Sequence, residues 1–393
     1  MKEVYLGSRK TGTYILRSNT KLILEQGAGV FASEVVEDYY VDDTIFEDTC
    51  NNEFGRSLFY GRGVENVEIT GKKGSVINGC GVKWKESENF LKRPSLIRLV
   101  DCKNVKLTNL SLLDSPCWGI HLLNCENVTI ENISIVSKWG ANNDGIDIDC
   151  CRNVRVNGCV IDTGDDCIAI KGTKNVLTKN IVIENCRLQS DWAAFKIGTE
   201  SVGDFEDIVF RNNTIDKALG CAIKIVPTDG GSIYNCEVSN IEAKNVTGPI
   251  FIANGERMRT YYGGETRDNY SRIKDVTIDK FKADVIVGGM MPVCYANKGV
   301  VVITGTKDNP IENVVISDSA FTMPGGEPEK VDLYVEELGT SYPEFYTLGE
   351  LPASGVYFRH VHGIKLKNVT IKLKKEDARP KIVSDDVKLL KIR

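Results

Sequence analysis

Three aspartates lie close together in the sequence, in two short motifs near the middle of the chain. Asp144 belongs to Asn-Asn-Asp-Gly-Ile-Asp, and Asp165 and Asp166 belong to a Gly-Asp-Asp motif further along. Carboxyl groups held near one another raise one another's pKa, as a general acid at neutral pH requires. A pair of carboxyl groups that divides the roles of acid and base can cleave a glycosidic bond. The motifs therefore indicate hydrolytic chemistry if the fold brings them together.

A repeat along the chain must position these motifs. Each copy starts with Asn or Asp, continues with alternating apolar and polar residues, and ends in a second short apolar run. The copies start at Asn66, Asn104, Asn127, Asn153, Asn180, Asp207, Asp275, Asn313 and Asn368. A period of about 23 to 27 residues, built from short strands with no helical pattern between them, predicts a β-solenoid. A leucine-rich repeat has a similar period, but its L-x-x-L-x-L-x-x-N pattern is missing.

The second strands of successive copies align on a shared apolar-x-apolar core. The aligned segments are Ile120-His121-Leu122, Ile146-Asp147-Ile148, Ile168-Ala169-Ile170, Phe195-Lys196-Ile197 and Ile223-Lys224-Ile225. Because side chains alternate between the two faces of a strand, the flanking residues point inward and the middle residues form an outward column. A second column, two positions earlier, contains Trp118, Asp144, Asp166, Ala193 and Cys221, with Asp165 beside Asp166.

One face of five coils therefore gathers carboxylates, cations and aromatic rings. Strands in a sheet lie about 4.8 Å apart, so adjacent coils can supply the separation of roughly 6.5–9.5 Å that suits an inverting glycosidase. Lys196 and Lys224 could bind a sugar carboxylate. Trp118 and Trp192 fit either a platform for a sugar ring or packing at the rim, and His121 fits a hydrogen-bonding surface residue better than a catalyst. A Gly-Asp-Asp motif alone is more typical of a solvated turn; its functional interpretation depends on Asp144 stacking beside it.

The expected fold is all-β, a single-stranded right-handed parallel β-helix (β-solenoid) that forms one domain over residues 1–393. The later steps of the repeat lengthen, which predicts surface insertions near 253–271, 284–298 and 322–350. Loops of that length usually carry function or contact a partner.

The composition excludes several classes of protein. The chain is 42% apolar and 26% charged, which is typical of a folded globular protein. A net charge of −5 without a long basic run argues against nucleic acid as a partner, and no apolar stretch is long enough to span a membrane. The 13 cysteines lack zinc-site spacing, so we interpret them as reduced, buried residues. Together with the absence of a signal-like segment at Met1, they favour a cytoplasmic location.

At the aspartate motifs the sequence resembles the polygalacturonase-like glycoside hydrolases of family 28. The matching stretches are Ser115 to His121, Asn142 to Asp147, Gly164 to Lys171, Ile197 to Ser201, Gly220 to Lys224 and Gly355 to Val361. The resemblance extends over nearly the whole chain. The pairing of N-x-D-G-x-D with a later G-D-D is a specific signature, and the family consists of right-handed parallel β-helices that invert configuration.

The resemblance implies a role for each site residue. Asp165 resembles the general acid, and Asp144 and Asp166 resemble the pair that activates water. Lys224 matches the lysine of the family's R-I-K motif. The remaining candidates for substrate binding are Lys171, Lys196, Asp147, His121, Trp118 and Trp192. Neither a metal nor an organic cofactor is expected.

Three features depart from the family's pattern. The histidine of its G-H-G motif falls on Ala193, and the arginine of R-I-K falls on Ala222. We infer that Lys196 partly replaces them, and that a branched or mixed pectic oligosaccharide is a better substrate than unbranched polygalacturonan. The chain also starts almost inside a strand at Val4, where the family has an earlier coil and a cap. We expect either further chain or another subunit, as in a homo-oligomer, to cover that end.

The leading hypothesis is an inverting, exo-acting hydrolase of galacturonate- or rhamnogalacturonan-type oligosaccharides. One alternative is a carbohydrate-binding β-helix that has lost catalysis, motivated by Ala193 and Ala222. A second is a β-helical pectate lyase, which would need calcium carboxylates and a cationic base. Their products differ, because a lyase product absorbs ultraviolet light, a hydrolase releases reducing ends and a binding protein yields neither.

Overall fold

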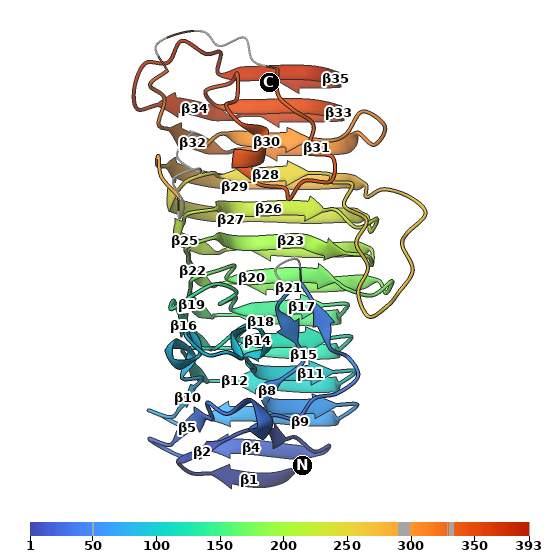
Figure 1. Ribbon diagram of the computed structural model, residues 1–393. Helices are drawn as coiled ribbons and strands as arrows, with labels where there is room; N and C mark the ends of the chain where they lie inside the picture. Colours follow the sequence, from blue (N-terminus) through green and yellow to red (C-terminus); the bar gives the residue numbers. More distant parts are fainter. Residues whose placement is uncertain (49–50, 290–298, 328, 330–333, 393) are drawn as a thin grey trace.

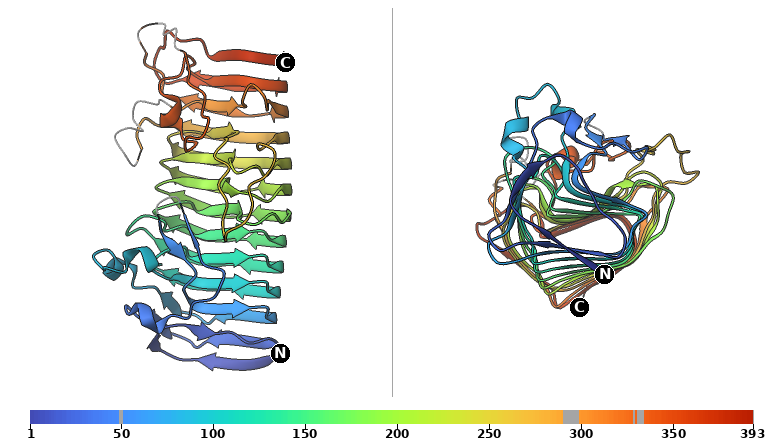
Figure 2. Two further views of the ribbon diagram at one scale, coloured as in Figure 1. Left: turned by 45° about the vertical axis from the view of Figure 1, so that its right-hand side comes forward. Right: turned by 90° about the horizontal axis from the view of Figure 1, so that it is seen from below.

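The chain folds as a parallel β-helix, as the repeat predicts. The computed structural model describes residues 1–48, 51–289, 299–327, 329 and 334–392. Each coil contributes up to three strands, and these coil strands pair in parallel with those of the neighbouring coils (Figure 1). Seen along its axis, the chain winds around a closed interior (Figure 2).

One ladder of strands carries both aspartate motifs and is called the site sheet below. It contains β3 (Tyr14–Ile15), β8 (Ser57–Arg62), β11 (Ser95–Val100), β14 (Ile120–Leu123), β17 (Ile146–Asp149), β20 (Ile168–Gly172), β23 (Ala193–Ser201), β26 (Cys221–Pro227), β28 (Ile250–Ala253), β30 (Val301–Thr304), β33 (Val356–Lys367) and β35 (Ile382–Ile392).

Two further ladders complete the coils. The second contains β1 (Lys2–Leu6), β4 (Thr20–Leu24), β9 (Glu65–Gly71), β12 (Lys103–Thr108), β15 (Glu126–Glu131), β18 (Arg152–Asn157), β21 (Thr178–Glu184), β24 (Phe205–Arg211), β27 (Ile233–Val246), β29 (Ile273–Val285) and β31 (Ile311–Ser317), which pairs with β33. The third contains β2 (Arg9–Thr11), β5 (Gly29–Ala32), β10 (Val76–Asn78), β13 (Ser111–Leu113), β16 (Ser134–Ser137), β19 (Val160–Thr163), β22 (Arg187–Ser190), β25 (Thr214–Ala218), β32 (Ala320–Met323) and β34 (Thr370–Leu373), with the ends of β27 and β29 between β25 and β32.

The core is a set of stacked apolar side chains, and the corners between strands carry stacked amides. Ile120, Ile146 and Ile168 are fully buried one above another, as the alignment requires. The Asn residues that begin the repeats adopt a left-handed conformation with φ near 55°. This conformation is tolerated by Asn better than by most residues. The Asn127 amide donates to the Asn104 side-chain oxygen at 3.1 Å, and the same bond recurs in successive coils.

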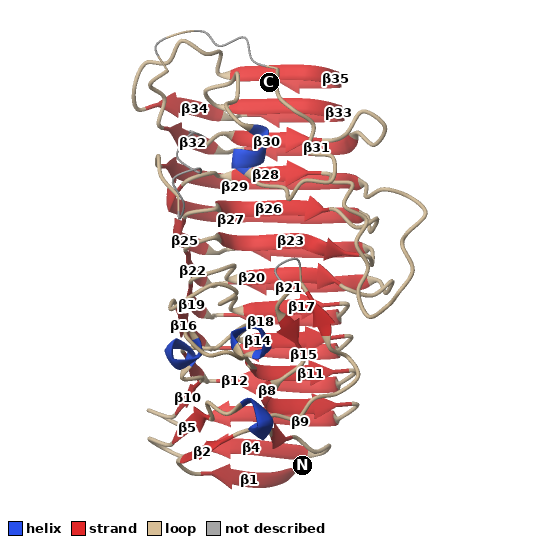
Figure 3. Cartoon of the chain, viewed as in Figure 1, coloured by secondary structure: helices blue, strands red, loops and turns tan. Residues whose placement is uncertain are grey.

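Insertions gather on one side of the coils (Figure 2). The segment between β28 and β29 corresponds to the insertion predicted near 253–271, and the segment between β32 and β33 to that near 322–350. Part of the insertion predicted near 284–298 lies outside the described residues. Two other insertions, 33–56 and 79–94, have no counterpart in the sequence analysis. They carry the hairpin β6 (Phe46–Glu47) and β7 (Glu53–Phe54) and the short 3₁₀ helices η1 (Val36–Asp38), η2 (Gly81–Trp84) and η3 (Phe90–Lys92), whereas η5 (Phe345–Leu348) lies before β33 (Figure 3).

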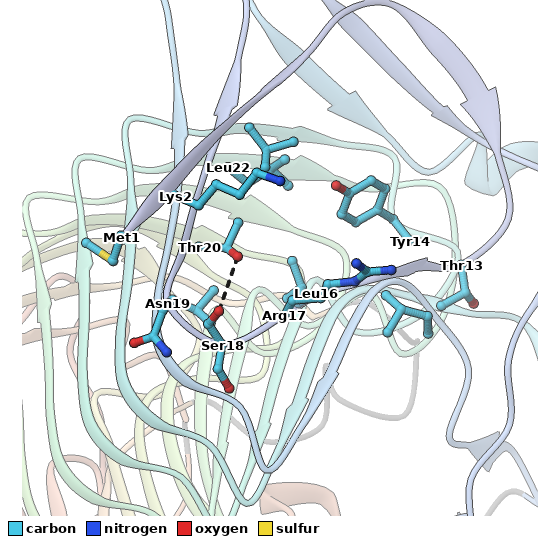
Figure 4. Close-up of a pocket in the computed structure, with 13 residues that line it drawn as sticks. Met1, Lys2, Thr13, Tyr14, Leu16, Arg17, Ser18, Asn19, Thr20 and Leu22 are labelled. Atoms are coloured by element: carbon cyan, nitrogen blue, oxygen red, sulfur yellow. Dashed lines mark hydrogen bonds between the residues drawn. The ribbon is translucent and has the colours of Figure 1, made fainter.

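A cavity of ≈ 810 Å³ lies at the N-terminal end of the stack (Figure 4). Leu16 and Leu22 line it together with Tyr14, and its charged lining residues are Lys2 and Arg17. It is the end of the coil interior, and its lining contains no carboxyl group that could act as an acid or a base. Within the part of the chain that the structure describes, no helix is both long and apolar enough to cross a bilayer.

Ten of the eleven cysteines within the described ranges are buried, and none of the eleven forms a disulfide. The sequence interpretation of these residues as small buried side chains therefore holds for that part of the chain.

Candidate active site

The predicted outward column on the site sheet is confirmed by the strand register. His121 pairs with Asp147, Asp147 with Ala169, Ala169 with Lys196, and Lys196 with Lys224. Backbone hydrogen bonds continue the second column, because Gly119 N–H donates to the Asp144 carbonyl and Gly145 N–H donates to the Asp166 carbonyl. The period-2 alternation of β-strands thus places the two motifs side by side.

The three aspartates converge at this point. One carboxylate oxygen of each of Asp144, Asp165 and Asp166 lies within 4.8 Å of the other two. Asp144 and Asp166 are buried, whereas Asp165 is partly exposed. The nearest oxygens are closer than the 6.5–9.5 Å that separates the catalytic carboxyls of inverting glycosidases, so this distance does not by itself indicate inversion. The same three oxygens are the ones that could hold a cation.

Asp166 is held by groups that stabilise a negative charge. Its Oδ2 atom accepts a hydrogen bond from the Lys196 ammonium at 2.9 Å, and its Oδ1 atom accepts one from Ala193 N–H at 3.1 Å. Lys196 also donates to the Tyr342 hydroxyl at 3.0 Å. A positive charge is therefore already present beside the aspartates. The substrate-carboxylate contact expected of Lys196 stays a prediction.

Of the three converging aspartates, Asp144 and Asp165 have surroundings that favour the protonated form. Burial raises the pKa of Asp165, and the charge of Asp166 raises it further. Asp165 accepts backbone hydrogen bonds from Asn142 at 3.1 Å and from Asp166 at 2.9 Å. Burial, followed by the charges of Asp147 and Asp165, raises the pKa of Asp144 well above its usual range. The Oδ1 atom of Asp144 has no hydrogen-bond partner within the described residues.

Lys171 connects the two columns. Its ammonium lies 3.0 Å from Glu200 Oε2 and 3.5 Å from Asp147 Oδ1, and 4.6 Å from the centre of the Trp118 ring. Burial disfavours the charged form of Lys171, but Glu200, Asp147 and Asp144 outweigh burial and raise its pKa. Lys171 therefore remains an ammonium that neutralises part of the acidic cluster.

A cavity of ≈ 490 Å³ opens beside the aspartates and lysines of this cluster. Its lining contains the three aspartates, Lys171, Lys196, Trp118 and Trp192 from the sequence prediction. The other lining residues are Asp48, Asn52, Phe90, Leu91, Ala141, Asn142, Glu200, Tyr342 and Tyr346. The insertions 33–56, 79–94 and 324–355 supply most of this second group, so the walls come from insertions and the floor from the site sheet.

The insertion 33–56, which forms one wall of the cavity, is bound to the site sheet by side-chain contacts. Arg98 of β11 is fully buried and donates to the Thr44 hydroxyl at 2.9 Å and to the Thr44 carbonyl at 2.8 Å. Phe54 stacks on Trp118 with ring centres 3.9 Å apart. Since Phe54 and Lys171 both pack on the Trp118 ring, rim packing explains this tryptophan better than a sugar platform does.

Three predicted substrate-binding residues do not line the cavity. His121 is fully buried; its Nδ1 accepts from Arg98 at 3.3 Å, and burial lowers its pKa to about 4. Asp147 is fully buried beside Lys171. Lys224 is fully buried in an ion pair with Glu344. Their side chains do leave the coil as predicted, but Phe46 of the insertion 33–56 covers His121, Glu344 of the insertion before β33 covers Lys224, and Lys171 lies beside Asp147.

Sequence reasoning also missed several lining residues. Glu200 lies four residues after Lys196 in β23, so the alternation along the strand could have placed it on the same face. No comparable signal exists for Tyr342 or Tyr346, which come from an irregular segment far from the repeat.

We expect Asp144→Asn to stabilise the protein at neutral pH. Because the folded-state pKa of Asp144 is raised, its carboxyl group costs no stability below the unfolded value and destabilises the fold increasingly as pH rises. Urea unfolding should show a gain of about 0.5–2 kcal/mol at pH 8 and little change at pH 4. Asp308→Asn, at an exposed position, is the control. A loss of stability in Asp144→Asn at pH 8 would contradict a raised pKa of Asp144 in the folded protein.

Comparisons with known proteins agree with this geometry. The family model described as glycosyl hydrolases family 28 matches residues 42–336. A probable polygalacturonase of Vitis vinifera is 28% identical over 281 residues, covering 67% of this chain and 56% of that protein. An endo-polygalacturonase of Pectobacterium parmentieri is 29% identical over 269 residues, covering 65% of this chain and 60% of that protein. The chain spans about half the length of the curated relatives it matches.

Solved structures share the fold. An exopolygalacturonase from Thermotoga maritima superposes with a TM-score of 0.69 at 23% identity, covering 94% of this chain and 84% of its own. A polygalacturonase from Erwinia carotovora ssp. carotovora superposes with a TM-score of 0.63 at 19% identity, and the match covers 100% of this chain and 89% of that one. At these identities the likeness concerns the β-helix alone. The family match covers about three quarters of the chain, and the chain belongs to glycosyl hydrolases family 28.

Proposed function

We propose that the protein is an inverting, exo-acting hydrolase of pectic oligosaccharides. The observation that carries the proposal is the convergence of Asp144, Asp165 and Asp166 on the floor of a cavity of sugar-binding size. Membership of family 28 supports hydrolysis of a glycosidic bond, and inversion rests on the resemblance to that family.

The three aspartates have environments suited to different roles. Asp165 serves as the acid that protonates the leaving oxygen, because its pKa is raised and its side chain is partly exposed in the cavity. Asp166, beside the Lys196 ammonium, serves as the carboxylate that takes a proton from water. Asp144 presents an oxygen that has no hydrogen-bond partner among the described residues, where the attacking water can be oriented.

The exo mode is supported by the walls of the cavity. Phe90 and Leu91 approach from one insertion, and Tyr342 and Tyr346 approach from another that lies more than two hundred residues later in the chain. A site bounded by insertions from both ends of the sequence fits the end of a glycan chain better than a continuous polymer.

A catalytically inactive carbohydrate-binding β-helix is the second candidate. It is favoured by Ala193 and Ala222, both fully buried at positions where the resembling family carries a histidine and an arginine. The lyase alternative has less support, because Lys171 and Lys196, the cations beside the aspartates, are each already in contact with a protein carboxylate.

Product analysis on defined pectic oligosaccharides tests the proposal. Hydrolysis should release reducing ends without ultraviolet absorbance, and proton NMR of the first product should show the anomer opposite to that of the substrate linkage. Release of single terminal units marks exo action. Absence of reducing ends across the panel would favour the binding protein, and an absorbing product would favour the lyase.

A further inference from the structure

A second buried ion pair lies next to the cavity. The Lys224 ammonium donates to both carboxylate oxygens of Glu344, and both residues are almost completely buried. Glu344 also accepts a hydrogen bond from the Trp192 indole at 3.0 Å, and the Lys224 ammonium lies 4.9 Å from the Trp192 ring centre. Since Trp192 lines the cavity, an internal carboxylate occupies the position beside Lys224 that an acidic sugar would need.

The cations that do line the cavity are also occupied. Within the described residues these are Lys171 and Lys196, which contact Glu200 and Asp166 respectively. Both pairs are buried, so separating either one to bind a ligand would leave a carboxylate buried without its partner, which is costly. A sugar carboxylate could therefore contact either ammonium only beside the negative charge of Glu200 or Asp166, which would repel it.

The remaining charges oppose an acidic ligand. Five acidic residues line the cavity against the two lysines: Asp48, Asp144, Asp165, Asp166 and Glu200. If Asp144 and Asp165 hold protons, three carboxylates still face two ammonium groups. The rest of the lining is rich in aromatic and apolar surface, from Phe90, Leu91, Trp192, Tyr342 and Tyr346, which suits the faces of a neutral sugar ring.

We infer that the cavity selects a neutral sugar unit. Glu344 is the specificity-determining residue, because its ion pair with Lys224 keeps the Lys224 ammonium from binding the carboxylate of a uronate. This inference rests on the proposed function and narrows its substrate to pectic oligosaccharides with a neutral sugar at the position bound by the cavity. It assigns Lys196 to holding Asp166 instead of a substrate carboxylate.

Monosaccharide binding tests the selectivity without depending on turnover. D-galactose and D-galacturonate differ by a hydroxymethyl group in place of the carboxylate, and L-rhamnose is a second neutral probe. Titration calorimetry of the intact protein at neutral pH should give a dissociation constant for the better neutral sugar at least roughly tenfold below that for galacturonate.

Three variants test the part played by Glu344. Glu344→Gln leaves the Lys224 charge unmatched, so galacturonate affinity should rise roughly tenfold, the scale of one charge-assisted contact, with little change for the neutral sugars. Glu344→Gln combined with Lys224→Met removes both charges and should show no gain. The double variant also buries no unpaired charge, so it keeps the test open if the single variant folds poorly. Glu350→Gln, at an exposed position in the same insertion, should behave as wild type.

The outcomes separate the inference from the proposed function. If reducing ends are released but no neutral sugar binds more tightly than galacturonate, the inference is overturned and the hydrolase proposal stands. Equal galacturonate gains in the single and double variants would overturn the role of Glu344. If no sugar binds and no product forms, both proposals fail together.

Discussion

Asp165→Asn is expected to reduce turnover by about 10²–10⁴-fold, the usual contribution of a general acid. The substitution keeps the shape of the side chain and can retain one of the two backbone hydrogen bonds, from Asn142 or from Asp166, but it removes the proton that the leaving oxygen needs. Steady-state kinetics on the best oligosaccharide of the panel should therefore show a lower kcat with little change in KM.

Substrates whose leaving groups differ in basicity provide a control for the role of Asp165 as the acid. A substrate whose leaving group is a weakly basic phenol needs little protonation, so Asp165→Asn should retain much more activity on it than on the oligosaccharide. Asp308→Asn provides the matched exposed substitution. A variant that keeps more than about a third of the wild-type turnover on the oligosaccharide would exclude Asp165 as the acid.

Asp166→Asn should cause a loss of similar size, about 10²–10⁴-fold, for a different reason. An amide cannot accept the proton of the attacking water, and it also leaves the Lys196 ammonium without its carboxylate. Turnover should fall even on substrates with weakly basic leaving groups, because water activation is needed for every substrate. This difference distinguishes the base from the acid.

The pH profile of Asp166→Asn provides an independent measurement. After burial, the charge of Asp166 is the largest cause of the raised pKa of Asp165. Activity requires protonated Asp165, so it falls as pH rises through that pKa. Without the Asp166 charge the fall in residual kcat should occur at lower pH. An unchanged alkaline limb would mean that another group is the proton donor.

The sequence predicts the coil and the position of the aspartates because both depend on local periodicity. The strand alternation places Asp144 beside Asp166 and Lys196 beside Lys224, and the described strands have that register. The Asn residues at the start of each repeat are visible in the sequence because only a few residue types tolerate a left-handed backbone there.

The sequence does not predict the walls of the site, because they depend on contacts between segments without a repeat. Nothing in the pattern around Glu344 indicates that it lies against Lys224, 120 residues earlier. His121 and Lys224 face away from the coil as expected, yet the insertions bury them. The alternation gives the direction of a side chain from its strand but not what covers it.

The contact between two insertions has a consequence for the order in which the molecule folds. Arg259 donates to the backbone carbonyls of Glu47 and Asp48, both at 2.7 Å and more than two hundred residues earlier. Coils can form by adding each strand to its neighbour, whereas this contact must wait until both distant segments exist. We therefore expect the catalytic cavity to be completed last and lost first. In a urea titration, enzymatic activity should disappear at a lower concentration than the β-sheet signal in circular dichroism.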